Sequence, residues 1–235
     1  MTRKNISQEK IINAFLFCAF DKSAGATSMA DIAEYLGIKK ASLYNHFESR
    51  EIMYEKTLKY CKRAINTFTF LPEKYITPDL FEKNDVFTIF DNLIKRFVQF
   101  YEVEPYFQIF TFVHTEKYFN KSAAEIVDEE HFSLELGVSQ ILLRYCVEKK
   151  LDLTPAEIDS AVKWYSSCLM QQIDLYIMHK KEIVRQNPEC GAGSLFALPT
   201  DEEALSKIFN LSENYLKRLF VLDDFSFVVK NDFFN

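Results

Sequence analysis

Glycine and proline are scarce in this sequence, with five and six among 235 residues. This composition argues against a fold made of many tight turns, and no glycine-rich phosphate-binding loop is present. The long uncharged stretches, such as those at 11–20 and 105–115, are shorter than the roughly 18 to 20 apolar residues that cross a bilayer. We therefore expect an all-α protein that does not span a membrane.

The cysteines are few and scattered. There are five, an odd number far apart in the chain, so neither a disulfide framework nor a CxxC metal site is indicated. Residues 6–20 have the pattern of an amphipathic helix and not that of a secretory signal, which leads us to expect a cytoplasmic protein. Hydrophobic residues make up 48% of the chain, enough for a substantial core in one or two domains.

Positive charge is concentrated at the N-terminal end. Residues 1–63 contain 11 Lys and Arg against 7 Asp and Glu, whereas the rest of the chain contains 17 against 27. A basic head on an acidic body is the distribution expected when one end of a protein meets a polyanion. Ordinary solvated helices can show the same imbalance.

Helix-capping patterns divide the N-terminal part of the chain. The predicted elements are a helix capped by Ser7, a short helix with a Ser28–Asp31 capping box that ends at Gly37, a helix at 40–46, and a helix from Ser49 to about 70. Pro72 and Pro78 then interrupt the helical periodicity. We expect two domains, residues 1–63, with the fourth helix continuing to about 70, and residues 71–235.

The C-terminal part has a helical pattern as far as about residue 222. Helices are predicted at 85–103, from Pro105 onward, from a cap at Ser122 to about 150 in one or two pieces, at 154–184 with Thr154 and Glu157 as a capping box, and at 201–222 capped by Thr200 with Glu203. The segment 187–199 is expected to be a loop. The helix at 85–103 is apolar almost all round, which is typical of a helix inside a bundle.

The segment 28–47, SMADIAEYLGIKKASLYNHF, predicts two short helices that cross at a turn. Gly37 supplies the left-handed residue that reverses the chain. Ile32, Leu43 and Phe47 belong to the small core that fixes the crossing. The outward face of the second helix is then polar, cationic and aromatic, which suits a DNA major groove roughly 12 Å wide.

Other positions extend this pattern over residues 6–58. They are Ile12, Phe15, Phe20, Gly25, the run ATSMADIAEYLGI at 26–38, SLYNHF at 42–47, and Ser49-Arg50-Glu51. Together they resemble the DNA-binding domain of the TetR family of bacterial transcriptional regulators. Two positions depart from the family: Ala26 follows Gly25 where a bulky residue is usual, and Lys39 stands where Ser or Thr usually caps the recognition helix.

The resemblance implies roles for individual residues. Base edges would be faced by Lys40, Ala41, Ser42 and Asn45, and phosphates would be held by Thr27, Ser28, Lys39, Tyr44, His46 and Arg50. For His46, a hydrogen bond within the domain is an equally good interpretation. The DNA partner is expected to be double-stranded.

Aromatic residues are concentrated in the C-terminal part, where 19 of the 23 Phe lie beyond residue 63. They can be ordinary core, but aromatic-lined space between helices is also the usual site for a small molecule. The TetR resemblance implies an effector there. Candidate pocket residues are Phe90, Phe97, Phe107, Phe110, Trp164 and Tyr165, with Trp164 and Tyr165 expected to face residues 86–119 across the bundle.

Long apolar stripes mark the last two predicted helices, at 154–184 and 201–222. The resemblance implies that they pair with the same helices of a second subunit. Candidate interface residues are Leu169, Tyr176, Phe209, Leu216 and Phe220. These expectations describe a homodimeric repressor that a small, largely hydrophobic effector releases from a palindromic operator.

Two other functions compete with this one. Asp128 and His131 lie one helical turn apart, as in helical-bundle metal proteins and enzymes, but no second pair is found. Gly-x-Ser-x-Gly, HExxH and P-loop motifs are absent, so we expect no enzyme, no metal and no cofactor. The second alternative is a helix-turn-helix protein that binds other proteins and not DNA.

Overall fold

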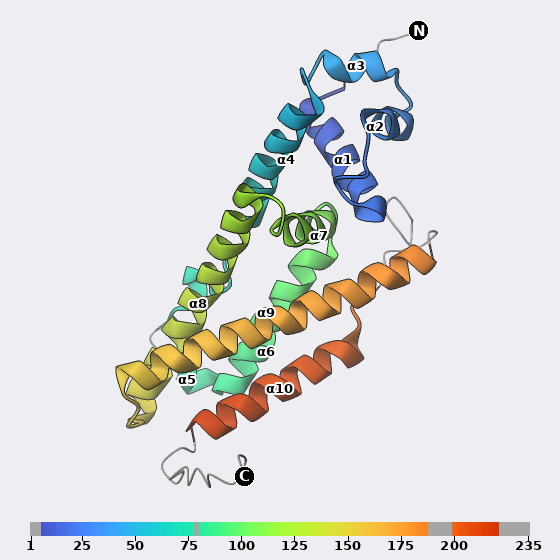
Figure 1. Ribbon diagram of the computed structural model, residues 1–235. Helices are drawn as coiled ribbons and strands as arrows, with labels where there is room; N and C mark the ends of the chain where they lie inside the picture. Colours follow the sequence, from blue (N-terminus) through green and yellow to red (C-terminus); the bar gives the residue numbers. More distant parts are fainter. Residues whose placement is uncertain (1–5, 78–79, 188–198, 221–235) are drawn as a thin grey trace, which may run out of the picture.

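The computed structural model describes residues 6–77, 80–187 and 199–220, and within these ranges the regular elements are all helical (Figure 1). They are α1 (Gln8–Lys22), α2 (Met29–Leu36), α3 (Lys40–Tyr44), α4 (Arg50–Ile65), the 3-10 turn η1 (Glu73–Tyr75), α5 (Leu80–Lys83), α6 (Val86–Glu102), α7 (Tyr106–Glu116), α8 (Lys121–Lys149), α9 (Pro155–Gln186) and α10 (Glu202–Phe220). The predicted all-α fold is confirmed. No helix in the described ranges is long and apolar enough to cross a membrane.

Local capping chemistry explains most helix starts. The Ser7 hydroxyl accepts from the Lys10 amide at 3.2 Å, and both halves of the Ser28–Asp31 capping box are formed. The capping box between Thr154 and Glu157 is also complete. These three predictions are confirmed. A cap depends on residues only three apart in the chain, so the sequence alone is enough to predict it.

Three predicted helix boundaries are wrong: the end of α4 and the starts of α8 and α10. Helix α4 stops at Ile65 and not near 70, because the chain leaves the helix and places Phe70 and Leu71 in the core. Helix α8 is one unbroken helix, and its cap is Asn120, whose side-chain oxygen accepts from two backbone amides.

Helix α10 is capped by Asp201, whose carboxylate accepts from the Ala204 amide at 2.9 Å. The predicted cap, Thr200, instead donates to Glu102 of α6 at 2.5 Å. The predicted loop at 187–199 lies almost entirely outside the described residues.

Helices α1 to α4 surround a small core that α7 and α8 complete. Phe15, Ile32, Leu43 and Phe47 are almost fully buried there. Ile109, Phe112 and Val113 of α7, with Ala123 and Ile126 of α8, pack into the same cluster. Helix α7 therefore packs against α1 and α4, the helices on either side of the helix-turn-helix segment.

A larger core joins α6, α8, α9 and α10. Its fully buried aromatic residues include Phe90, Phe97, Tyr101 and Phe110. The backbone of α8 approaches the segment after α4 closely, since a side chain at Gly137 would meet Phe70 at 3.0 Å. Helices α9 and α10 lie at the end of the molecule away from α3 (Figure 1).

One acidic residue of α6 makes stability depend on pH. Partial burial raises the pKa of Asp91 to about 6, and Glu213 and Asp85 add to the effect. The folded state therefore holds this proton more tightly than the unfolded state, so its contribution to stability falls as the pH rises from about 4 to about 6.

We expect Asp91→Asn to stabilise the protein at pH 7.5, by no more than about 1 kcal/mol because solvent screens this half-buried site. At pH 3.5 the Asp91 carboxyl would be largely protonated in both the folded and the unfolded state, so the difference between the two proteins should nearly vanish. Thermal unfolding of both proteins across this range measures the effect. A stabilisation that is independent of pH would contradict the assignment.

Candidate functional site

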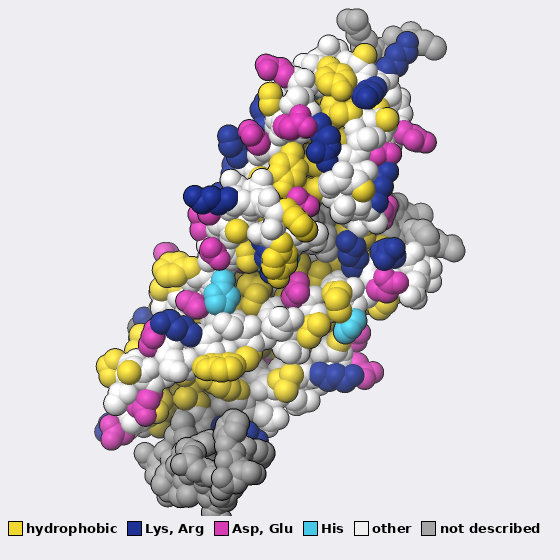
Figure 2. All heavy atoms as spheres, in the orientation of Figure 1, with side chains coloured by type: hydrophobic (Ala, Val, Ile, Leu, Met, Phe, Trp, Pro, Cys, Tyr) yellow, Lys and Arg dark blue, Asp and Glu magenta, His cyan; other side chains and the backbone are white. Residues whose placement is uncertain are grey.

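Helix α3 presents a polar and cationic surface at one end of the molecule (Figures 1 and 2). The exposed side chains are those of Lys39, Lys40, Ala41, Tyr44 and Asn45, while those of Ser42 and His46 are half-buried. Inward, Leu43 and Phe47 are buried in the N-terminal core. The predicted division of α3 into an inner and an outer face is confirmed.

The turn before α3 is fixed by backbone geometry. Gly37 has φ +64°, and the amide of Ile38 donates to the Ala33 carbonyl at 2.9 Å. At the far end of α3, the Gln8 side chain donates to the His46 carbonyl at 2.9 Å. Lys39 makes no side-chain cap, as its residue type predicts. Its ammonium group therefore remains exposed next to Lys40.

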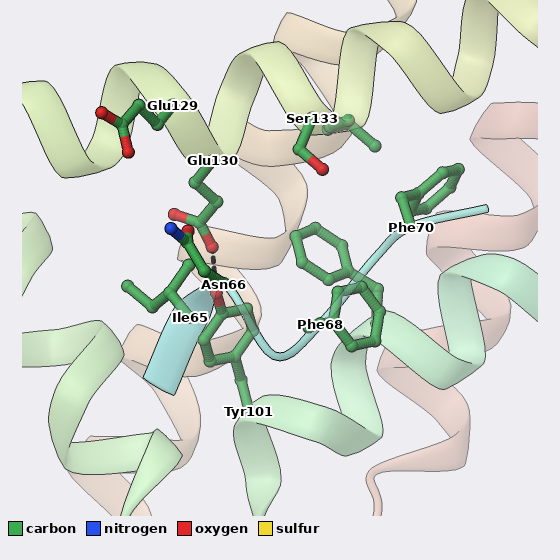
Figure 3. Close-up of a pocket in the computed structure, with 10 residues that line it drawn as sticks. Ile65, Asn66, Phe68, Phe70, Tyr101, Glu129, Glu130 and Ser133 are labelled. Atoms are coloured by element: carbon green, nitrogen blue, oxygen red, sulfur yellow. Dashed lines mark hydrogen bonds between the residues drawn. The ribbon is translucent and has the colours of Figure 1, made fainter. Parts of the chain in front are cut away.

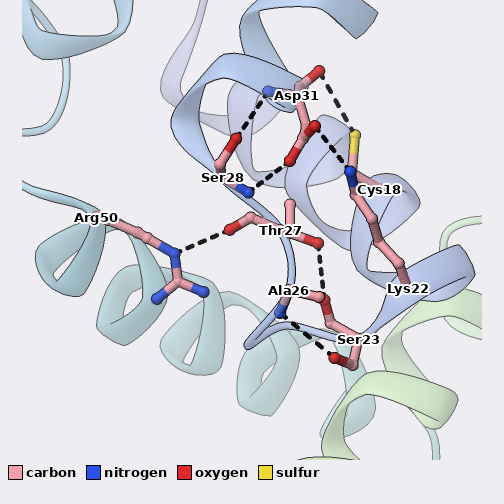
Figure 4. Close-up of polar contacts among 8 residues, drawn as sticks. All are labelled: Cys18, Lys22, Ser23, Ala26, Thr27, Ser28, Asp31 and Arg50. Carbon is pink, nitrogen blue, oxygen red and sulfur yellow. Dashed lines mark hydrogen bonds and ion pairs between the residues drawn. The ribbon is translucent and has the colours of Figure 1, made fainter.

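Arg50 is half-buried, and its side chain donates to backbone carbonyls of its own domain (Figure 4). Its Nε donates to the Thr27 carbonyl at 2.9 Å, and its Nη2 donates to the Ala24 carbonyl. The guanidinium carbon also lies 6.0 Å from the centroid of the Phe15 ring. The expected phosphate role is therefore corrected: Arg50 links the start of α4 to the loop between α1 and α2.

Thr27 is also unsuited to the predicted phosphate role. Its side chain is 1% exposed, and its hydroxyl donates to the Ser23 carbonyl at 2.7 Å. Ser28 stays exposed at the start of α2, where it shares the capping box with Asp31. Lys22 lies 2.7 Å from Asp31, and this contact, together with Ser28, lowers the pKa of Asp31 to about 2.

We expect Arg50→Ala to lower the free energy of unfolding by about 2 to 4 kcal/mol, because it removes two charge-assisted hydrogen bonds and an aromatic contact. Chemical denaturation followed by circular dichroism measures this loss. Arg63→Ala, at an exposed position of the same helix, is the control and should change little. If Arg50→Ala keeps full stability and only flattens the salt dependence of DNA binding, Arg50 contacts a phosphate and the structural role is wrong.

The predicted pocket residues are mostly core. Five of them, Phe90, Phe97, Phe107, Phe110 and Tyr165, are buried in the larger cluster. Trp164 is 67% exposed on α9, so the expectation that it faces the α6 aromatics is wrong. Apolar periodicity along a long helix does not distinguish its inner face from a second apolar face.

A small cavity lies between α4, α6 and α8, close to Phe97 (Figure 3). Its volume is about 30 Å³, and its lining includes Phe68, Phe70, Tyr101 and Glu130. The space is sufficient for a water molecule and not for a drug-sized ligand. An effector would enter only if the surrounding side chains moved.

A buried polar cluster beside this cavity was not predicted. The hydroxyl of Tyr101 donates to Glu130, and His114 Nε2 lies 2.9 Å from the other carboxylate oxygen. Burial, reinforced by the Glu130 carboxylate, raises the pKa of Tyr101 well above its usual value. The three residues come from α6, α7 and α8, and their spacing in the sequence carries no sign of this contact.

The residues predicted for the dimer interface lie in, or pack against, the core of the subunit itself. Leu169, Tyr176 and Leu216 are buried within the subunit, and Phe209 and Phe220 are half-buried against the same cluster. The apolar side chains that α9 and α10 expose are instead Trp164, Met178, Ile183 and Leu211. A groove of about 560 Å³ runs between the two helices, and its lining includes Cys168 and Leu211.

The residues of the metal alternative find other partners. His131 Nδ1 lies 3.4 Å from Glu135, and Asp128 is exposed. Among the residues that the structure describes, no three His, Cys, Asp or Glu side chains are grouped as metal ligands would be. In the part of the chain that the structure describes, the fold therefore does not supply the further ligands that a metal site at Asp128 and His131 would need.

Comparison with known proteins agrees with the arrangement of α1 to α4. The family model of bacterial regulatory proteins of the tetR family matches residues 11–57. The biofilm operon icaADBC negative transcriptional regulator IcaR of Staphylococcus aureus strain Newman is 31% identical over 97 residues, covering 39% of this chain and 52% of that protein. The IcaR protein of Staphylococcus epidermidis is 35% identical over 54 residues, covering 23% and 29%. The matches to IcaR thus span about half of that protein's length or less.

Solved structures resemble the chain over most of its length. A transcriptional regulator from Rhodococcus sp. Rha1 has a TM-score of 0.52 at 12% identity, covering 89% of this chain and 97% of its own. A TerR/AcrR-family regulator from Aquifex aeolicus VF5 has a TM-score of 0.51 at 15% identity, covering 91% and 99%. At these identities the likeness concerns the fold alone.

Proposed function

Since this chain belongs to the TetR family of transcriptional regulators, which are not enzymes, we propose that it is a repressor that binds a palindromic operator as a homodimer and leaves it when a small molecule binds. The observation that carries the proposal is the exposed face of α3, held out from the molecule by the buried contacts of Leu43 and Phe47. In this role it acts in the cytoplasm.

DNA recognition is assigned to residues 1–63. Lys40, Ala41 and Asn45 are exposed where a major groove would meet α3, and half-buried Ser42 lies among them. Lys39, Tyr44, His46 and the exposed start of α2 at Ser28 flank this face and are suited to phosphates. Arg50 and Thr27 support the domain from within.

Effector binding and dimerisation are assigned to residues 71–235. The exposed apolar side chains of α9 and α10, with Trp164 and Leu211 prominent among them, support an interface with the same helices of a second subunit. The aromatic-lined cavity beside Tyr101 supports a largely hydrophobic effector, which must enlarge that cavity to enter. Because α7 packs into the N-terminal core, such a change would reach the DNA-binding helices.

The function is tested with DNA from upstream of the protein's own gene. We expect the full-length protein to bind a palindrome in this DNA far more tightly than random DNA, with an affinity that falls steeply as salt rises. Fluorescence anisotropy measures both properties, and a panel of apolar compounds is then screened for release. Equal binding to the upstream DNA and to random DNA would favour the protein-interaction alternative.

A further inference from the structure

A groove separate from the cavity of Figure 3 lies where α1 and α2 meet the turn between α6 and α7. Its volume is about 320 Å³, within the size range of small-molecule sites. Its lining includes Asn13 and Phe17 of α1, Tyr35 of α2, and Glu104 and Gln108 beside and within α7. The groove thus has one wall from the N-terminal helices and one from the C-terminal part of the chain.

Two amide oxygens at this groove lack a partner. Gln108 is only 5% exposed, yet its Oε1 accepts no hydrogen bond from any residue that the structure describes. The same holds for Oδ1 of Asn13, which is buried as well. A buried acceptor without a donor costs about 1 to 3 kcal/mol, so two along one groove are unusual.

A neighbouring contact fixes how the Gln108 amide is turned. Gln108 Nε2 donates to Glu104 Oε1 at 3.1 Å, so exchanging the two ends of this amide would place oxygen against a carboxylate. What the groove offers a ligand is therefore two carbonyl oxygens and the Glu104 carboxylate, all of which accept hydrogen bonds.

The rest of the lining favours a flat group. The rings of Phe17 and Tyr35 stack at 4.7 Å between centroids with 29° between their planes. Aromatic faces attract cations, and guanidinium-like groups stack on them. Lys10, the one cation among the lining residues, is exposed at the end nearer the start of α1.

We propose that this groove binds a small organic cation in which a planar amidinium or guanidinium group is attached to an apolar ring. The N–H groups of the cation would donate to the exposed Glu104 carboxylate and, once the lining side chains shift to uncover them, to the buried amide oxygens of Asn13 and Gln108. Its flat surface would lie against the Phe17–Tyr35 pair. An occupant contacts α1 and α7 together. If the proposed DNA-binding function holds, it would also change operator affinity.

The test is calorimetric titration of the full-length protein with benzamidinium, in the absence of DNA. We expect saturable binding that the neutral isostere benzamide and the anionic isostere benzoate do not reproduce. Equal binding of either isostere would overturn the proposed ligand class. No binding of benzamidinium would overturn the site. Because DNA is absent, failure of the proposed regulatory function leaves these results unaffected.

Variants test the position of the site. Gln108→Met should weaken benzamidinium binding by roughly tenfold or more, as expected for loss of a charge-assisted hydrogen bond. Its melting temperature should not fall, because an unpartnered acceptor is replaced by an apolar group of similar size. Gln99→Met, the same change at an exposed position of α6, is the matched control.

Glu104→Gln keeps the test decisive if Gln108→Met does not fold. Glu104 is exposed, so its replacement should be tolerated while benzamidinium binding weakens. Unchanged binding by either folded variant would place the ligand elsewhere and overturn the proposal.

Discussion

Lys40→Ala is expected to lower affinity for the operator by about 1 to 3 kcal/mol, or roughly 5- to 150-fold, and to lower affinity for random DNA much less. Lys40 is exposed in the first turn of α3, where a long cationic side chain can reach guanine O6 and N7. Losing this contact removes discrimination between bases as well as a charge. Fluorescence anisotropy with operator and random duplexes at several salt concentrations separates the two effects.

The matched control is Lys163→Ala. Lys163 is an exposed lysine of α9, paired with Asp159 at 2.8 Å and located away from α3. It should leave operator affinity unchanged. If Lys40→Ala weakens binding equally on both duplexes and only flattens the salt dependence, Lys40 contacts a phosphate and the predicted base contact is wrong.

Leu211→Glu is expected to convert the proposed dimer to folded monomers and to reduce operator affinity by roughly 100-fold or more, since each monomer would then bind one half-site without its linked partner. Leu211 is 54% exposed on α10 and lines the groove against α9. A carboxylate there would lie in the apolar centre of the proposed interface. Light scattering at micromolar concentration measures the assembly.

Phe119→Glu serves as the control because Phe119 is an exposed apolar residue at the turn between α7 and α8. It should remain dimeric. Trp164, exposed on α9, offers its fluorescence as a second measure of subunit association. A wild-type protein that is a folded monomer at this concentration, or a dimeric Leu211→Glu variant, would contradict the proposed interface.

Buried positions give a different outcome, which distinguishes interface from core. Leu216 is fully buried inside the subunit, and Leu169 is nearly so. A charge at either position would be desolvated without a partner and should unfold the protein. These residues, which the apolar stripes and the TetR resemblance assigned to the interface, therefore cannot test dimerisation.

The sequence by itself determined the helices and the helix-turn-helix segment, because these depend on residues close together in the chain. The Ser28–Asp31 and Thr154–Glu157 boxes each span three residues. The outer face of α3 follows from helical periodicity once Leu43 is placed inward. The motif of 28–47 was enough to indicate the family.

Only the tertiary structure showed which residues far apart in the chain contact each other. Arg50 binds carbonyls 23 and 26 residues away, and Glu130 meets Tyr101 and His114 from separate helices. A helix such as α9 carries apolar residues on more than one face, so its periodicity alone cannot show which face the subunit core takes. The buried face is decided by packing, because each buried contact depends on how two helices cross. The residues that meet at a crossing are far apart in the chain, so no local sequence pattern reveals them.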